Sequence, residues 1–110
     1  MMSVEDKLSA LLSKSRDWER RPTNIPGIFL LKLPSSRSIQ ASIAIEINPV
    51  DAAGAATKKR GIVIRSASEL KQFNNILVDQ KLIELARRID EVNPTQKEEV
   101  RDIGSDVFEI

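Results

Sequence analysis

The segment from Ser38 to Asn48 carries the most regular pattern in the chain. An apolar residue stands at every second position from Ile39 to Ile47, and mostly polar or small residues lie between them. Successive side chains of a β-strand point to opposite faces, so this alternation predicts a strand with one buried face and one wetter face. The chain is therefore expected to fold around a sheet.

Two more segments are expected to be strands of the same sheet. Ile28 to Leu33 is a short apolar run that ends at Pro34, and residues 34–37 have the composition of a hairpin turn. Gly61 to Arg65 forms the second run. Residues 49–60 lie between the second and third strands and consist mostly of small residues, so we expect a flexible loop that is long for a hairpin.

Helices are predicted before and after the sheet in the sequence. Ser3 and Asp6 have capping-box spacing, and the helix that they begin is expected to continue to about Trp18 and to fail before Pro22. Ser66 and Glu69 form a second capping box. Apolar residues then recur at helical spacing from residue 70 to residue 92, with a shift near residues 74–75 that allows a kink or a short break. Asn93 and Pro94 begin a short helix to about residue 102.

These elements predict a single α+β domain over residues 1–110, a length typical of one small domain. An N-terminal helix occupies residues 1–21, and an antiparallel sheet of three to four strands occupies residues 28–65. A long C-terminal helix and a short helix occupy residues 66–103, and an acidic and apolar tail follows at 104–110.

The alternation also suggests how the sheet faces divide. We expect Ile39, Ile43 and Ile47 to face the helices. Their expected neighbours on that face are Phe29, Leu31, Leu33, Ile62 and Ile64. The opposite face would then carry Ile28, Leu30, Lys32, Gln40, Ser42, Ala44, Glu46, Val63 and Arg65. Such a face could hold a flexible nucleic-acid strand, or it could be an ordinary solvated sheet face.

Composition excludes several kinds of chemistry. The chain has no Cys, His or Tyr, so it has no disulfide, no thiol nucleophile and no imidazole base or ligand. Its adjacent carboxylates, such as Glu98 and Glu99, do not share a helix face. We therefore expect no enzymatic activity, no metal and no cofactor. The start of the chain does not resemble a secretory signal and no apolar run is long enough to span a membrane, so we expect a cytoplasmic protein.

The near-neutral net charge of +1 hides an asymmetry. Residues 1–65 contain 11 Lys and Arg against 6 Asp and Glu, whereas residues 66–110 contain 6 against 10. A basic half and an acidic half in one small chain suggest a site for an anionic polymer and a compensating tail.

The candidate contacts to such a polymer are cations and one aromatic ring. Lys58, Lys59 and Arg60 are consecutive on the long loop, where they could contact phosphates or only keep the loop solvated. Trp18 lies among three arginines, where its ring could stack on a base or cover the core. The expected phosphate-binding residues are Lys58, Lys59, Arg60, Arg65, Lys32 and Arg37, extended by Arg16, Arg20 and Arg21.

The run from Lys58 to Ile64, followed by the helix that starts at Ser66 to Glu69, carries a resemblance to known families. The stretch from Gly27 to Asn93, which contains this run, resembles the positive-cofactor-four and Whirly families, in which a basic-Gly-apolar strand leads into a helix that helps form a dimer. The N-terminal helix and the composition also resemble the archaeal ThermoDBP-type proteins. Both resemblances imply binding of single-stranded DNA. The present chain has few aromatic residues and three clear strands, which departs from both patterns.

The sequence therefore predicts a homodimer that binds single-stranded DNA or RNA with little sequence preference. The long helix from Leu70 to Val92 presents more apolar surface than a three-stranded sheet can cover, which favours a dimer contact there. The alternative is a non-enzymatic protein–protein interaction or scaffold module that docks through a sheet face or through the tail at 104–110.

Overall fold

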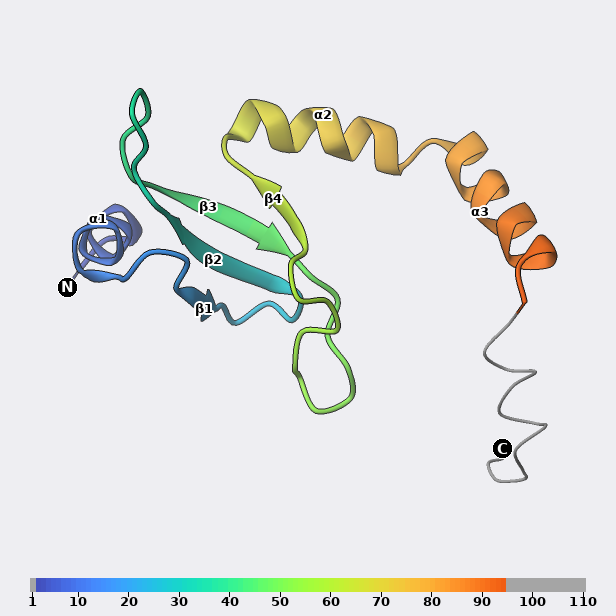
Figure 1. The fold of residues 1–110 in the computed structure, drawn as a ribbon, viewed down its shortest axis with the longest axis horizontal. Coiled ribbons are helices and arrows are strands. Elements are labelled where there is room, and N and C mark those ends of the chain that lie inside the picture. Colours follow the sequence, from blue (N-terminus) through green and yellow to red (C-terminus); the bar gives the residue numbers. More distant parts are fainter. Residues whose placement is uncertain (1, 95–110) are drawn as a thin grey trace. The chain divides into compact units, whose positions relative to one another are not determined.

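The computed structural model describes residues 2–94, which form three helices and a four-stranded antiparallel sheet (Figure 1). The elements are α1 (Val4–Lys14), β1 (Arg20–Pro22), β2 (Ile28–Leu33), β3 (Ser42–Ile47), β4 (Ile62–Ile64), α2 (Ala67–Leu77) and α3 (Gln80–Val92). The fold is α+β, as the sequence predicts. The chain divides into two compact units, one ending at Leu70 and the other beginning at Lys71. None of the helices in the described part is long and apolar enough to cross a membrane.

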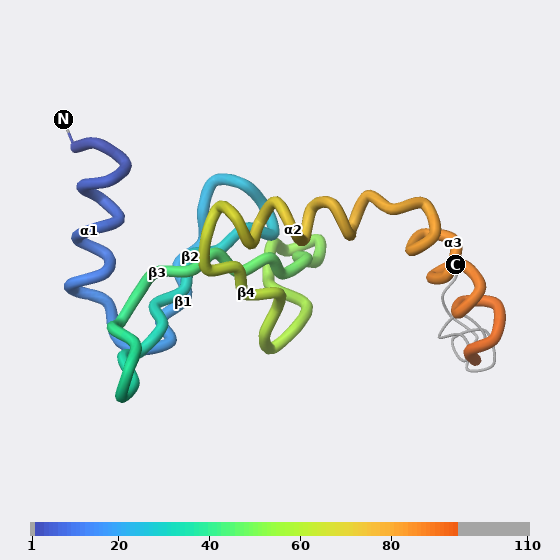
Figure 2. Tube along the Cα trace, turned by 90° about the horizontal axis from the view of Figure 1, so that it is seen from above, coloured from blue at the N-terminus to red at the C-terminus, as the bar shows by residue number. Residues whose placement is uncertain are grey.

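Helix α1 begins as predicted and ends earlier than predicted. The Ser3 hydroxyl accepts a hydrogen bond from the Asp6 amide at 3.0 Å, and the Asp6 carboxylate accepts one from the Ser3 amide. The helix stops at Lys14, because Ser15 adopts an extended backbone conformation as its C-cap. The predicted helix over residues 1–21 is therefore too long. Figure 1 shows α1 end-on and Figure 2 shows it lengthwise, so this helix rises away from the sheet.

The residues beyond α1 form a turn and an edge strand. The Glu19 amide donates to the Arg16 carbonyl, which closes a turn over Asp17 and Trp18. Trp18 lies in this turn with a φ of 67°, a left-handed conformation that bulky residues rarely adopt. Strand β1 then pairs antiparallel with β2, with Arg20 opposite Leu31. The turn and the pairing of β1 with β2 thus replace the helix that the sequence predicts as far as Trp18.

The register of β2 against β3 corrects the predicted sheet faces. Ile28 lies opposite Ile47 and Lys32 lies opposite Ile43, and directly opposed residues share a face. One face, here called face A, carries Ile28, Leu30, Lys32, Ile43, Ile45, Ile47, Ile62 and Ile64. The other, face B, carries Arg20, Phe29, Leu31, Leu33, Ser42, Ala44, Glu46 and Val63. The predicted wet face therefore does not exist, because its residues are divided between both faces.

Both faces contain buried residues. On face B, Leu31, Leu33 and Ala44 are each 3% exposed and form one hydrophobic cluster, which Val63 packs against. On face A, Ile64 is 1% exposed, and Leu8 of α1 lines the same hollow as Leu30. Face A thus packs beside the N-terminal helix.

Two connections lie at opposite ends of the sheet (Figure 1). The β2–β3 connection covers residues 34–41, where Ser36 and Ile39 exchange backbone hydrogen bonds. It is longer than the predicted turn, and Ile39, which the sequence places in a strand on the core face, is 54% exposed. The β3–β4 connection contains the predicted loop at 49–60, with a bridge between Val50 and Ala56.

Helices α2 and α3 take the place of the long helix that the sequence predicts, with an interruption between them. The Ser66 hydroxyl accepts a hydrogen bond from the Glu69 amide at 3.1 Å, which confirms the start of α2. The break falls at residues 78–79, after the predicted position, because the Asp79 side chain accepts from the Lys81 amide and begins α3. Helix α3 has 13 residues. The predicted short helix to residue 102 and the tail at 104–110 lie outside the described residues.

Candidate nucleic-acid interface

A fully buried carboxylate lies beneath the basic end of the long loop. Glu46 on face B has no exposed surface, and both of its oxygens accept hydrogen bonds. Oε1 accepts from Arg20 Nε at 2.7 Å, and Oε2 accepts from Arg20 Nη2 at 2.9 Å. Oε2 also accepts from the Gly61 amide at 2.7 Å and from Asn48 Nδ2 at 3.1 Å. A buried charge is tolerated when it is paired and hydrogen-bonded in this way.

These contacts decide the ionisation of Glu46. Burial by itself would raise the pKa of the Glu46 carboxyl, because the charged form loses its hydration. The hydrogen bonds from Gly61, Arg20 and Asn48, with the positive charge of Arg20, outweigh that effect. The pKa of Glu46 is therefore held below its ordinary value of 4.5. The group remains a carboxylate at neutral pH and keeps all four hydrogen bonds.

The same network fixes the backbone of residues 58–61. Asn48 is also fully buried, and its side chain exchanges hydrogen bonds with the Lys58 amide and carbonyl at 3.2 and 2.8 Å. The Lys59 carbonyl accepts from Arg20 Nη2 at 2.8 Å. Gly61 lies so close to β3 that an added Cβ would stand 2.2 Å from the Ile47 carbonyl oxygen. The basic end of the predicted flexible loop is therefore hydrogen-bonded across face B.

Above this network, two residues that are distant in the sequence meet at the surface. The Arg60 guanidinium carbon lies 4.3 Å from the centroid of the Trp18 ring. Trp18 is 47% exposed, so its ring does not belong to the core. A guanidinium at this distance from an indole face is a cation–π contact. The turn after α1 and the basic end of the loop thus form one surface.

The structure brings part of the predicted set together and gives Arg20 another role. Arg16 and Trp18 share the turn after α1, and Lys58, Lys59 and Arg60 carry exposed side chains next to it. We call these five residues the basic surface. Arg20 lies beneath it, with its guanidinium on Glu46 and on the Lys59 carbonyl and 5.4 Å from the Phe29 ring. The prediction that Arg20 contacts phosphates is corrected, because its guanidinium holds the fold together.

Lys32 is also a structural residue. Its side chain is on face A, the residue is only 8% exposed, and Nζ donates to the carbonyls of Leu12 and Ser15 at 2.6 and 3.1 Å. These carbonyls belong to the C-terminal end of α1, where a cation compensates unpaired acceptors and the helix dipole. The predicted phosphate contact of Lys32 is therefore wrong, since its ammonium group is buried.

Arg37 and Arg65 lie away from the basic end of the long loop. Arg37 is exposed in the connection at 34–41, at the end of the sheet opposite the long loop (Figure 1). Arg65 follows β4 and lines a hollow of about 360 Å³ with Leu8 and Leu70. Both side chains are exposed, but the fold does not bring them next to residues 58–60.

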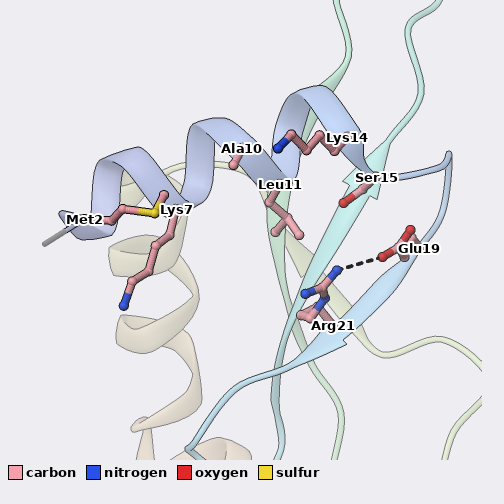
Figure 3. Close-up of a pocket in the computed structure, with 8 residues that line it drawn as sticks. All are labelled: Met2, Lys7, Ala10, Leu11, Lys14, Ser15, Glu19 and Arg21. Carbon is pink, nitrogen blue, oxygen red and sulfur yellow. Dashed lines mark hydrogen bonds and ion pairs between the residues drawn. The ribbon is translucent and has the colours of Figure 1, made fainter.

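Arg21 belongs to a different hollow, between α1 and the turn that follows it (Figure 3). Leu11 points from the helix toward Arg21, whose Nη2 lies 3.1 Å from Glu19 Oε2. The pKa of Glu19 is lowered, first by the hydrogen bond from the Arg16 amide and then by Arg21. Lys7 and Lys14 also line this hollow of about 280 Å³. These two lysines are not among the site residues predicted from the sequence.

The residues that hold the basic surface in place were not predicted from the sequence either. Glu46 and Asn48 stand in the expected strand like ordinary polar residues on a solvated face, so the alternation gives no sign that they are buried. The one sign of this burial in the sequence is Gly61, because a glycine at the start of a strand often marks a close approach of another backbone segment. Only the tertiary contacts show what it approaches.

Within residues 2–94, no acidic side chains cluster closely enough to hold a metal ion. No protein-family model, no curated protein and no solved structure matches this chain.

Proposed function

We propose that the protein binds single-stranded nucleic acid, with DNA as the expected substrate, on the basic surface formed by Arg16, Trp18, Lys58, Lys59 and Arg60. The observation that carries this proposal is the contact of Arg60 with the Trp18 ring, which joins two basic segments into one surface. The resemblance to small single-stranded-DNA-binding families, the absence of an enzymatic role and a cytoplasmic location are parts of the same proposal.

The chemistry of this surface suits a flexible strand. Proteins that bind single strands without sequence preference combine cations along the backbone with an aromatic ring on which a base can stack. Trp18 offers a half-exposed indole face, and the neighbouring cations offer partners for phosphates. A duplex keeps its base faces stacked inside, so the indole favours single strands.

The charges of the surface are not neutralised within the described part of the chain. The salt bridges among residues 2–94 involve Arg20, Arg21, Arg87 and Arg88. Lys58, Lys59 and Arg60 take part in none of them. When such side chains bind phosphates, the counterions condensed on the nucleic acid are released, and this release supplies most of the affinity of sequence-independent binding.

The backbone that carries these cations is already ordered by the contacts to Glu46 and Asn48. Ordering a loop during binding costs free energy, and a loop that is already hydrogen-bonded avoids part of that cost. The network therefore supports binding without contacting the ligand.

We also propose that the protein is a homodimer and that α3 contributes to the contact. Leu82, Leu85, Ile89 and Val92 recur at spacings of three and four, so they lie on one side of this helix. They are 38, 55, 46 and 81% exposed. Light scattering at micromolar concentration should give twice the chain mass of 12.3 kDa, and a mass of one chain would contradict the dimer.

Fluorescence anisotropy with labelled oligo(dT) tests the binding proposal. The unmodified protein should bind at low salt and release the strand as salt increases. The triple variant K58A/K59A/R60A should bind more weakly, and its log–log salt dependence should be flatter by about two units, since each phosphate contact to a single strand contributes roughly 0.7.

A matched triple variant controls for the change in net charge. K71A/K81A/R87A also removes three exposed cations, but from α2 and α3. It should bind oligo(dT) like the unmodified protein, with the same salt dependence. No binding at low salt would contradict the proposed function and favour the protein–protein interaction module. Equal salt slopes for the K58A/K59A/R60A variant and the unmodified protein would remove these residues from the site.

A further inference from the structure

A small hollow opens between the basic end of the loop and the edge of face A. It has a volume of about 350 Å³ and is lined by Ile47, Pro49, Lys58, Arg60, Gly61 and Ile62. Ile47 and Ile62 are direct partners across β3 and β4, so their side chains lie together on the same face. Ile62 is 38% exposed. The hollow therefore has an apolar floor that the chain leaves accessible.

The charged residues that line the hollow are both cations, Lys58 and Arg60. An apolar floor suits any flat apolar group, and two cations suit any anion. The combination suits a ligand in which a flat apolar group and an anion are joined by a few bonds. A nucleotide has this character, with an aromatic base and a phosphate joined by a sugar. The volume is near the lower end of the range of about 300–1,000 Å³ for small-molecule sites, which fits one such unit.

We propose that this hollow binds one nucleotide of the single strand, with its base against Ile47, Pro49 and Ile62 and its phosphate between Lys58 and Arg60. This inference rests on the proposed function and names a subsite of it. Apolar side chains can support a base in place of an aromatic ring, which is consistent with the small number of aromatic residues in the chain.

Arg60 connects the subsite to Trp18. Arg60 is one of the residues that line the hollow, and its guanidinium carbon lies 4.3 Å from the centroid of the Trp18 ring. A phosphate bound to Arg60 would therefore join a base in the hollow to a neighbouring base on the indole. The two apolar surfaces and the cation between them define the path of a strand that is at least two nucleotides long.

The walls of the subsite are held in place before a ligand arrives. The Lys58 amide donates to Asn48 Oδ1, and the Gly61 amide donates to Glu46 Oε2. These acceptors are fully buried, so the backbone on both sides of Arg60 is fixed from below. A preformed rim of this kind is what distinguishes a subsite from a chance depression on a loop.

The test is the variant Ile62→Ala, with Leu70→Ala as its matched control. Leu70 is 39% exposed and lines a separate hollow, so its removal deletes a similar amount of apolar surface. Ile62→Ala should weaken binding of oligo(dT) about fivefold, in the range measured when a base loses its stacking partner. Its salt slope should not change, because no phosphate contact is lost. Leu70→Ala should bind like the unmodified protein.

An oligonucleotide without bases separates a base contact from an indirect effect. Ile62→Ala should bind an abasic strand as well as the unmodified protein does, since there is no base to lose. Ile62→Thr provides a second variant that keeps the β-branched shape in the strand and makes the floor polar, and it should weaken oligo(dT) binding in the same way.

The failure of the subsite and the failure of the proposed function give different results. If the unmodified protein binds oligo(dT) and both Ile62 variants bind it equally well, the subsite is overturned and the function stands. The subsite is also overturned if Ile62→Ala weakens abasic and base-containing strands alike. If the unmodified protein does not bind at low salt, both proposals are overturned together.

Discussion

Arg20 and Glu46, which are 26 positions apart in the sequence, form a bidentate ion pair. Arg20 Nε lies 2.7 Å from Glu46 Oε1, and Arg20 Nη2 lies 2.9 Å from Glu46 Oε2. The pair joins β1, at the edge of the sheet, to β3 on the far side of β2. Through the Lys59 carbonyl and the Gly61 amide it also holds the basic end of the loop. One buried carboxylate thus connects three segments of the chain.

Replacement of this carboxylate should be costly. Glu46→Ala leaves Arg20 without its partner and the Gly61 amide without an acceptor. Removing one member of a buried ion pair typically costs about 3–5 kcal/mol; because the Arg20 side chain is 32% exposed, the free energy of unfolding in urea should fall by about 3 kcal/mol. Glu19→Ala breaks a more exposed pair with Arg21, where solvent screens the two charges, and should cost much less. Similar losses for the two variants would show that the Glu46 network does not hold the fold.

The lowered pKa of Glu46 predicts how stability depends on pH. A carboxyl whose pKa is lower in the folded state than its ordinary value of 4.5 stabilises the fold above that value. This contribution is lost as pH falls through 4.5 toward the folded-state pKa. Urea denaturation between pH 7 and pH 3 should show the loss, and Glu46→Gln should show a smaller one. An equally steep loss in Glu46→Gln would assign the acid sensitivity to other carboxyls, such as Glu19.

The fold was predictable where the pattern of one segment decides the structure. The alternation from Ile43 to Ile47 marks β3, and the capping boxes at Ser3 and Ser66 mark two helix starts. The sheet faces were not predictable, because alternation tells which residues of one strand share a face but not how two strands align. A shift of one residue in register moves a whole strand face, and the prediction for β2 made that error.

The candidate site was predictable in its cations but not in their roles. Charge patterning selects Lys58 to Arg60, and these side chains are exposed. The same patterning selects Lys32 and Arg20, whose charges are used inside the fold by helix carbonyls and by Glu46. From the sequence, a cation that caps a helix end cannot be told apart from an exposed cation that could bind a phosphate. Only the acceptors that surround them, contributed by distant segments, separate the two.

Gly61 should tolerate no side chain. An added Cβ would stand 2.2 Å from the Ile47 carbonyl oxygen and 2.9 Å from Asn48 Cβ, and backbone atoms cannot move aside cheaply. Gly61→Ala should therefore lower the free energy of unfolding by about 1–3 kcal/mol, a typical cost of overpacking. A fall of less than about 0.5 kcal/mol, the range of an ordinary surface substitution, would show that the steric contact with β3 is not decisive.

Trp18 offers the sharpest separation of stability from binding. Its φ of 67° is a conformation that glycine adopts without strain, and its ring is 47% exposed. Trp18→Gly should relieve backbone strain while it removes the contact with Arg60, so the two effects oppose each other. The free energy of unfolding should therefore stay within about 1 kcal/mol of the original value. Binding of oligo(dT) should nevertheless weaken about fivefold or more, because stacking contributes about 1–3 kcal/mol per base. Trp18→Phe keeps an aromatic face and should retain most of the affinity. A Trp18→Gly variant that folds and binds oligo(dT) as tightly as the unmodified protein would show that no base stacks on this ring.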